Sequence, residues 1–201
     1  VASIAEKKGW IPFLDFAYQG FGKNVEEDRA AVSAFSAVGI DFFISSSFSK
    51  NFGLYNERTG AITVVCSTTS EAAVAMSHLK KTVRVCYSNP PAHGGLVAKT
   101  ILSEPTLEKT WLSELAEMCN RIKAMRAALV NGLFERNIAQ DFSYIKAQNG
   151  MFSFSGLDDE TVSWLRENKA IYVVGGGRIN VAGLTSHNID YVCDSIAEAL
   201  K

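Results

Sequence analysis

Two apolar runs with a helical stretch between them dominate the first quarter of the chain. Residues 10–16 read WIPFLDF and run into the turn-like YQGFG, the pattern of a buried strand that closes at a loop. Residues 25–38 space apolar side chains at helical intervals, and residues 41–45 have the pattern of the next strand. A strand, a crossover helix and a strand of these lengths predict a parallel pair. Ligands bind beyond the carboxyl ends of such strands, which is where Asp15 and Lys50 stand.

The rest of the chain continues to alternate strands and helices. A third strand is expected over residues 61–66, a helix over residues 70–82, and a long amphipathic helix over residues 106–136. That last helix is long enough to leave one domain and enter another. Later elements are strands at 151–155, 171–174 and 178–181 and helices at 158–169 and 188–200. We therefore expect an α/β domain over residues 1–110 and a small α+β domain over residues 111–201.

The charge pattern argues against nucleic acid and anionic membranes as partners. The 201 residues include 20 basic and 21 acidic side chains, which are interspersed and give a formal net charge of -1. The longest apolar stretches are far too short to span a bilayer, and no signal-peptide pattern opens the chain. The three histidines have no ligand spacing, so no metal is assigned. A cytoplasmic protein that binds a small molecule is the expectation.

The start of the chain is unusual. It lacks an initiator methionine, and residues 1–8 have the pattern of the second half of a helix that ends at Gly9. We therefore expect the carboxyl-terminal part of a longer polypeptide. An organellar location stays open beside the cytoplasmic one, because the start of that polypeptide is missing.

One lysine stands among hydroxyl groups just after the second predicted strand. Residues 45–60 read SSSFSKNFGLYNERTG, with Lys50 behind Ser47 and Ser49 and with Arg58 eight residues later. A lysine amine is a poor nucleophile while it is charged, so a site that uses it must lower its pKa by desolvation or by nearby positive charge. Arg58 can supply that charge, and the hydroxyls can hold a phosphate. The segment fits a lysine that reacts with an aldehyde cofactor; the alternative is a serine-rich turn with a solvated lysine.

Four segments of the chain resemble the aspartate and aromatic aminotransferases, which are pyridoxal-phosphate enzymes of fold type I. They are FLDFAYQGF at residues 13–21, SFSKNFGLYNERTG at 47–60, RVCYSNPPAHG at 84–94 and GRINVAG at 177–183. The resemblance covers nearly the whole chain and implies the carboxyl-terminal half of such a protein. Residues 1–110 are then part of the cofactor-binding large domain, with a mostly parallel sheet and flanking helices. A long helix joins them to the small α+β domain, residues 111–201.

The resemblance implies the cofactor contacts residue by residue. Lys50 holds pyridoxal 5'-phosphate as an internal aldimine and, once a substrate amine displaces it, moves a proton between substrate and cofactor. Asp15 keeps the pyridine nitrogen protonated, and Tyr18 donates a hydrogen bond to the phenolic oxygen. The phosphate contacts are Ser47, Ser49 and Arg58. Taken without Lys50, the residues favour an Asp15 that caps the following turn and a Tyr18 that merely packs.

Two arginines are implied in substrate binding. Arg178 matches the residue that clamps the substrate α-carboxylate. Arg84 matches the residue that reaches in from the partner subunit of a homodimer and binds the side-chain carboxylate of a dicarboxylic substrate. Taken alone, each could be a surface arginine beside a turn. The resemblance thus implies transamination between L-aspartate and 2-oxoglutarate, with aromatic amino acids as further substrates, in a homodimer that includes the amino-terminal half.

Two other functions stay open at this point. A truncated fragment without catalysis, or an interaction module, would leave strand edges and apolar faces open. Another fold type I reaction, such as β-elimination or decarboxylation, would use the same lysine. Arg84 and Arg178 together favour transamination of a dicarboxylate. The length of the intact polypeptide separates the enzyme from the module.

Overall fold

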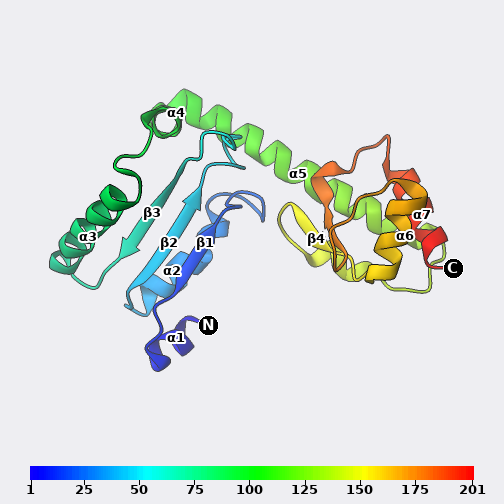
Figure 1. The fold of residues 1–201 in the computed structure, drawn as a ribbon, viewed down its shortest axis with the longest axis horizontal. Coiled ribbons are helices and arrows are strands. Elements are labelled where there is room, and N and C mark those ends of the chain that lie inside the picture. The colour runs from blue at the N-terminus through cyan, green and yellow to red at the C-terminus, as the bar shows by residue number, and fades with distance from the viewer. The chain divides into compact units, whose positions relative to one another are not determined.

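The computed structural model describes residues 1–201 and divides them into two compact units, residues 1–115 and 116–201. The first unit contains α1 (Ala2–Lys8), β1 (Phe13–Phe16), η1 (Glu27–Arg29), α2 (Ala30–Ala37), β2 (Phe42–Ser47), β3 (Gly60–Val65), α3 (Thr69–Tyr87) and α4 (Ala92–Ser103). The second contains η2 (Ser143–Ala147), β4 (Phe152–Phe154), α6 (Asp159–Lys169), β5 (Arg178–Asn180), η3 (Val181–Gly183) and α7 (Ile189–Ala199). The long helix α5 (Pro105–Glu135) begins in the first unit and ends in the second (Figure 1). None of the helices is both long enough and apolar enough to cross a membrane.

The first unit is built on a mixed sheet of three strands in the order β1-β2-β3 (Figure 1). β1 and β2 are parallel, which confirms the predicted strand, helix and strand arrangement, and β3 is antiparallel to β2. Asp15 pairs with Ser45 and Phe16 pairs with Ser46. The two parallel strands therefore end at the same edge of the sheet, and the loops that follow them lie together there.

Two short helices cover one face of this sheet. Phe42 of β2 has no exposed surface and packs against Phe35 of α2 and Ala5 of α1, with the two phenylalanine ring centroids 5.9 Å apart. α1 ends as predicted at Gly9, whose N–H donates to the Glu6 carbonyl oxygen. Its left-handed φ of 66° turns the chain so that the N–H of Trp10 reaches the Ala5 carbonyl oxygen. The apolar side chains of α1 and α2 thus anchor the strands from one side.

Two helices differ from the prediction in their extent. The stretch expected as one helix over residues 25–38 starts with the 3₁₀ turn η1 and becomes α-helical only in α2, because the Asn24 Oδ1 atom accepts the N–H of Glu27 at 2.7 Å and tightens the first turn. α3 is longer than the expected 70–82. It begins behind Thr68, whose hydroxyl accepts the N–H of Glu71 at 3.2 Å, and it continues to Tyr87 because the proline pair lies beyond that residue.

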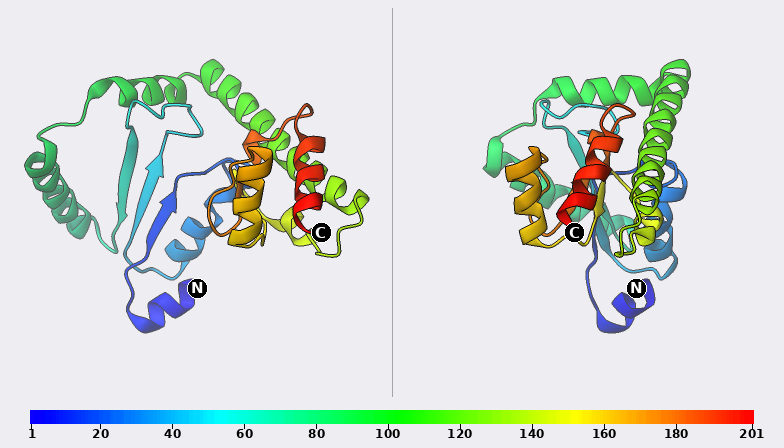
Figure 2. Two further views of the ribbon diagram at one scale, coloured as in Figure 1. Left: turned by 45° about the vertical axis from the view of Figure 1, so that its right-hand side comes forward. Right: turned by 90° about the vertical axis from the view of Figure 1, so that its right-hand side faces the viewer.

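The second unit packs α6 and α7 beside each other and α7 against the end of α5 (Figure 2). Arg136 holds α7 with its Nε 2.7 Å from Asp194 and its Nη1 2.8 Å from the Gly132 carbonyl oxygen. Cys193 is fully buried beside Gly132, and burial raises the pKa of its thiol to about 11, so the sulfur stays protonated at neutral pH. The buried apolar side chains of α5 in this unit are Cys119, Ile122, Leu129, Val130 and Leu133, and Arg126 of the same helix is buried beside them.

The strand expected over residues 171–174 is the one element that the structure does not contain. The strands predicted at residues 151–155 and 178–181 are present as β4 and β5, which pair antiparallel with each other. The stretch before β5 contributes only the single bridge between Val174 and Arg178. Gly176 and Gly177 both have a φ of 74°, so the chain reverses within three residues. That reversal brings Val174 back onto Arg178 and leaves no length for further pairing.

Replacing Gly132 by alanine should destabilise the second unit. An alanine Cβ there would lie 2.8 Å from the Sγ atom of Cys193, and overpacking of this kind costs about 1–3 kcal/mol. Denaturant unfolding measures the loss. In a Gly132→Ala, Cys193→Ala double variant the clashing sulfur is gone, so the loss in free energy of unfolding should be smaller than the sum of the two single losses. The control is Gly95→Ala in α4, whose added Cβ meets no atom within 4 Å and should not lower the stability. Additive losses would contradict the close contact.

Candidate active site

Lys50 lies in the loop that follows β2, and it is half-buried between two aromatic rings. Its Nζ atom is 4.9 Å from the ring centroid of Tyr18 and 5.9 Å from that of Tyr55. Tyr18 comes from the loop after β1, so the parallel pairing of the two strands is what brings the tyrosine to the lysine. The faces of the two rings attract the ammonium group.

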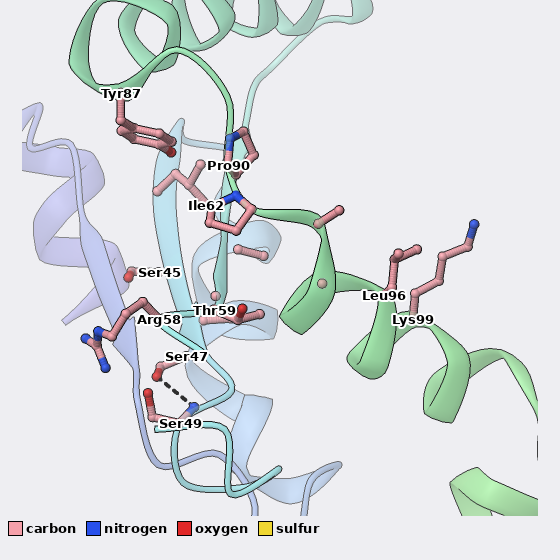
Figure 3. Close-up of a pocket in the computed structure, with 16 residues that line it drawn as sticks. Ser45, Ser47, Ser49, Arg58, Thr59, Ile62, Tyr87, Pro90, Leu96 and Lys99 are labelled. Atoms are coloured by element: carbon pink, nitrogen blue, oxygen red, sulfur yellow. Dashed lines mark hydrogen bonds between the residues drawn. The ribbon is translucent and has the colours of Figure 1, made fainter. Parts of the chain in front are cut away.

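Serine hydroxyls and an arginine border one cavity beside this loop. The cavity has a volume of about 810 Å³, and Ser45, Ser47, Ser49 and Arg58 are among its lining residues (Figure 3). The N–H of Ser49 donates to the Ser47 Oγ atom at 3.2 Å, which folds the loop so that both serines stand at the same wall. The predicted Ser47, Ser49 and Arg58 therefore lie together, and their hydroxyl and guanidinium donors can serve an anion.

The loop that carries Arg58 is held in a conformation which most residues avoid. Arg58 has a φ of 50°, a left-handed backbone that costs a residue with a Cβ about 1 kcal/mol, and its Nη1 donates to the Tyr55 carbonyl oxygen at 2.6 Å. α4 packs against this loop at Gly94, where any Cβ would overlap the Thr59 hydroxyl. The glycine is required because the helix approaches the loop too closely for a side chain.

Asp15 lies at the carboxyl end of β1, opposite Ser45 of β2. It is exposed, and its Oδ1 atom accepts the N–H of Ala17 at 3.0 Å, so it shapes the turn that leads to Tyr18. The structure thus brings six of the eight predicted site residues to one edge of the sheet. These six are Asp15, Tyr18, Ser47, Ser49, Lys50 and Arg58.

The two remaining arginines lie elsewhere in the chain. Arg84 is exposed on the last turn of α3 and donates to the Ser88 hydroxyl at 2.7 Å, while Tyr87 of the same turn lines the cavity. Arg178 belongs to the second unit, where its guanidinium carbon lies 4.0 Å from the ring centroid of Phe152. The stacking holds this exposed guanidinium against β4 and keeps its planar donor edge available to a carboxylate.

Asp28 organises the Tyr18 loop, although sequence reasoning did not single it out. Its carboxylate accepts three backbone N–H groups, those of Gly20 and Gly22 at 2.8 and 2.9 Å and that of Lys23 at 2.8 Å. Three donors that converge on one carboxylate fix the path of the loop between β1 and η1. A signal was present in the sequence, since a glycine-rich turn followed by an acid is the usual pattern of such a capped loop.

A second group that sequence reasoning missed lies on the other side of Lys50. Asn51 is buried, and its amide nitrogen donates to the Gln19 carbonyl oxygen at 3.3 Å. The carbonyl oxygen of Asn51 accepts the indole N–H of Trp111 at 2.6 Å. Trp111 belongs to a regular apolar series on α5, so its pattern indicated a packing residue and nothing in the sequence indicated its hydrogen bond.

A parallel strand pair, a lysine close to two tyrosine rings and a cavity bordered by serine hydroxyls and an arginine occur together in the first unit, which has the α/β organisation. The family model described as aminotransferase class I and II matches residues 1–196, and the chain belongs to this family. The match includes every predicted site residue.

Individual relatives agree with the family assignment. An aspartate aminotransferase from Haemophilus influenzae is 48% identical over 200 residues, a match that covers 100% of this chain and 50% of that protein. The solved aromatic-amino-acid aminotransferase from Burkholderia pseudomallei, covalently bound to pyridoxal phosphate, has a TM-score of 0.97 at 48% identity and again covers 100% and 50%. An aromatic aminotransferase from Psychrobacter, cocrystallised with aspartic acid, has a TM-score of 0.97 at 42% sequence identity and also covers 100% of this chain and 50% of that chain. The chain therefore spans about half the length of these relatives.

Replacing Asp28 by asparagine should loosen the Tyr18 loop. The amide keeps the shape of the side chain but turns one acceptor into a donor that faces backbone N–H groups. At this partly buried position an unpaired donor costs about 1 kcal/mol. Denaturant unfolding and amide hydrogen exchange at residues 20–23 measure the effect. Glu26→Gln, an equally conservative change at an exposed side chain nearby, is the matched control; equal stability of the two variants would refute the role of Asp28.

Proposed function

We propose that this chain carries the lysine of a pyridoxal-phosphate-dependent aminotransferase that uses aspartate and 2-oxoglutarate, with aromatic amino acids as further substrates. The observation that carries the proposal is that Lys50 lies beside the Tyr18 ring and directly follows Ser49, which borders one cavity with Ser47 and Arg58, in a chain of this family. The complete protein would need the half that these residues do not include and a second copy to form its sites.

The residues at the sheet edge fit this cofactor. The group needs a phosphate site, and two hydroxyls and a guanidinium border one cavity. It needs a carboxylate for its ring nitrogen, and Asp15 stands exposed at the end of β1, one strand away from the lysine loop. When bound, pyridoxal phosphate supplies an aldehyde that links to an amine and a ring that withdraws electrons from the substrate. The chemistry of the donors present matches each of these needs.

Lys50 would serve both as the anchor and as the proton carrier. The residue is half-buried, and its amine lies 4.9 Å from the ring centroid of Tyr18 and 5.9 Å from that of Tyr55, so the two rings help to hold it near one position. Once freed, an amine held at this point can take a proton from the substrate Cα and return it to another atom, which is general acid–base catalysis. Tyr18 would hold its hydroxyl at the oxygen nearest the lysine, and Arg58, Ser47 and Ser49 would anchor the phosphate.

Arg178 and Arg84 would select dicarboxylic substrates. An arginine grips a carboxylate through two parallel hydrogen bonds, and Arg178 presents an exposed guanidinium that the Phe152 ring supports from one side. Arg84 is exposed on α3 and tied to Ser88, which suits a residue that reaches toward another subunit. We assign Arg178 to the α-carboxylate and Arg84, acting across a homodimer, to the side-chain carboxylate.

The two compact units would correspond to parts of two domains. Residues 1–115 would be the carboxyl-terminal part of the large cofactor-binding domain, whose mostly parallel sheet would continue beyond the three strands seen here. Residues 116–201 would be the small domain. The open strands and helix faces of the first unit support this proposal, because α3 has no buried residue and exposes Val74, Met76 and Val85.

The same exposed faces favour one competing function, an interaction module without catalysis. A module would use the apolar surface of α3 for a partner and would leave Lys50 idle. A lyase or decarboxylase of the same fold type would use Lys50 but would have no need for two carboxylate-binding arginines. The mass of the complete gene product and its reaction with pyridoxal phosphate decide among the three.

Adding pyridoxal phosphate to the complete gene product should produce a visible absorption band that aspartate bleaches and 2-oxoglutarate restores. Lys50→Ala should abolish the band because no other amine is held between two tyrosine rings at this edge. Lys80→Ala, an exposed lysine on α3, is the matched control and should keep the band. Absence of the band in the unaltered protein, or its survival in Lys50→Ala, would sink the enzyme proposal.

Replacing Arg84 by leucine should separate the two substrate classes. Loss of the guanidinium removes the partner of the side-chain carboxylate, so kcat/KM for aspartate should fall about a hundredfold or more while that for phenylalanine changes little. Arg178→Leu, which removes the proposed α-carboxylate partner, should impair both substrates. Steady-state kinetics with both amino acids provides the measurement, and an equal loss for both in Arg84→Leu would refute its assigned role.

A further inference from the structure

We propose that Trp111 and Leu115 of α5 act as positioning residues that set the spacing between Lys50 and Tyr18. The inference rests on the proposed function and concerns how this chain prepares its site. Neither side chain touches the lysine amine. Each instead holds one of the two loops that carry the lysine and the tyrosine.

Trp111 holds the lysine loop. Its indole N–H donates to the carbonyl oxygen of Asn51, the residue after Lys50, at 2.6 Å. Its ring stacks on Phe52 with centroids 4.5 Å apart and an interplanar angle of 15°, and Phe52 in turn meets Phe48 edge-on at 5.2 Å. A polar contact and an aromatic contact thus fix the backbone on the carboxyl side of Lys50 to one helix.

Leu115 holds the tyrosine loop. Its side chain fills the space where a Cβ of Gly20 would lie, and Gly20 has a φ of 97°, a conformation that favours glycine. Leu115 stands four residues after Trp111, so the two side chains project from the same face of α5 one turn apart. One rigid helical turn therefore serves as the template for both loops.

Asn51 joins the two loops directly. Its amide nitrogen donates to the carbonyl oxygen of Gln19, the residue after Tyr18, at 3.3 Å. Asn51 is only 6% exposed, and its Oδ1 atom accepts no hydrogen bond. The bond to Gln19 is therefore the contact that fixes the orientation of the amide. With the amide flipped, the Oδ1 atom of Asn51 would face the Gln19 carbonyl oxygen, and the two acceptors would repel each other. The bond ties the backbone beside Lys50 to the backbone beside Tyr18, whose ring centroid is 4.9 Å from the lysine Nζ atom.

Loosening this template should change how the lysine site titrates. With pyridoxal phosphate bound, the Tyr18 hydroxyl would donate a hydrogen bond to the cofactor's phenolic oxygen; this would stabilise the negative oxygen and would lower the pKa of the group that gives the visible band. If the tyrosine loop moves away, the pKa should rise. A contact of this kind is sensitive to small displacements, and a shift of about 1 Å can also cost up to about a hundredfold in rate.

Trp111→Phe in the complete gene product tests the proposal, because it deletes the indole donor and keeps a ring that can stack on Phe52. With pyridoxal phosphate bound, the pH midpoint of the visible band should rise by about 0.5 units or more. Trp164→Phe, the same substitution in α6 of the second unit, is the matched control and should leave the midpoint unchanged. In a Tyr18→Phe background, Trp111→Phe should add no further shift, since the tyrosine through which it acts is gone.

Amide hydrogen exchange on the cofactor-free protein separates this inference from the proposed function. Residues 17–20 and 48–53 should exchange faster in Trp111→Phe and in Asn51→Ala than in Trp164→Phe. If the unaltered protein shows no visible band, the proposed function fails, and the exchange measurement still decides on the template. An unchanged midpoint in Trp111→Phe, or exchange equal to that of the control, overturns the inference. Asn51→Ala provides the second variant should Trp111→Phe not fold.

Discussion

The parallel pairing of β1 and β2 is the constraint on which the candidate site depends. Parallel strands end at the same edge of a sheet, so pairing Asp15 with Ser45 forces the two following loops to meet. Tyr18 and Lys50 are 32 residues apart in the chain, and this pairing brings their loops to the same edge of the sheet. The apolar contact of Phe42 with Phe35 and Ala5 holds the pair from the opposite side, so burial of three side chains on one face fixes the chemistry at the edge.

The site is kept in shape mainly by groups that do not belong to it. Asp28 gathers three backbone N–H groups of the tyrosine loop, and Trp111 holds the lysine loop by one hydrogen bond and one ring contact. Arg58 stays in a left-handed conformation beside a helix that can approach only because residue 94 is glycine. These contacts hold the amine in one position before any ligand binds, so little conformational entropy is lost on binding.

Local pattern was a good guide to the elements and a poor guide to their ends. Apolar periodicity predicted the parallel pair, the long helix α5 and the carboxyl-terminal helix α7, because each depends on a face that must be buried. It overextended the helix before Gly39, where the Asn24 side chain favours a 3₁₀ turn. It also proposed a strand over residues 171–174, where two left-handed glycines leave room for only one bridge. A side-chain hydrogen bond decided the first case and the backbone conformation of two glycines decided the second, and apolar periodicity registers neither.

By itself the sequence determined the class of fold and the residues that can carry lysine chemistry. The serine-rich run around Lys50, the acid at the end of a strand and the two arginines are local patterns, and their residue types limit the reactions open to them. Only the tertiary structure decided which of them meet. The tie from Trp111 through Asn51 to Gln19 spans 60 and then 32 residues of sequence, and contacts at such separations follow from the packing of elements, which no local pattern contains.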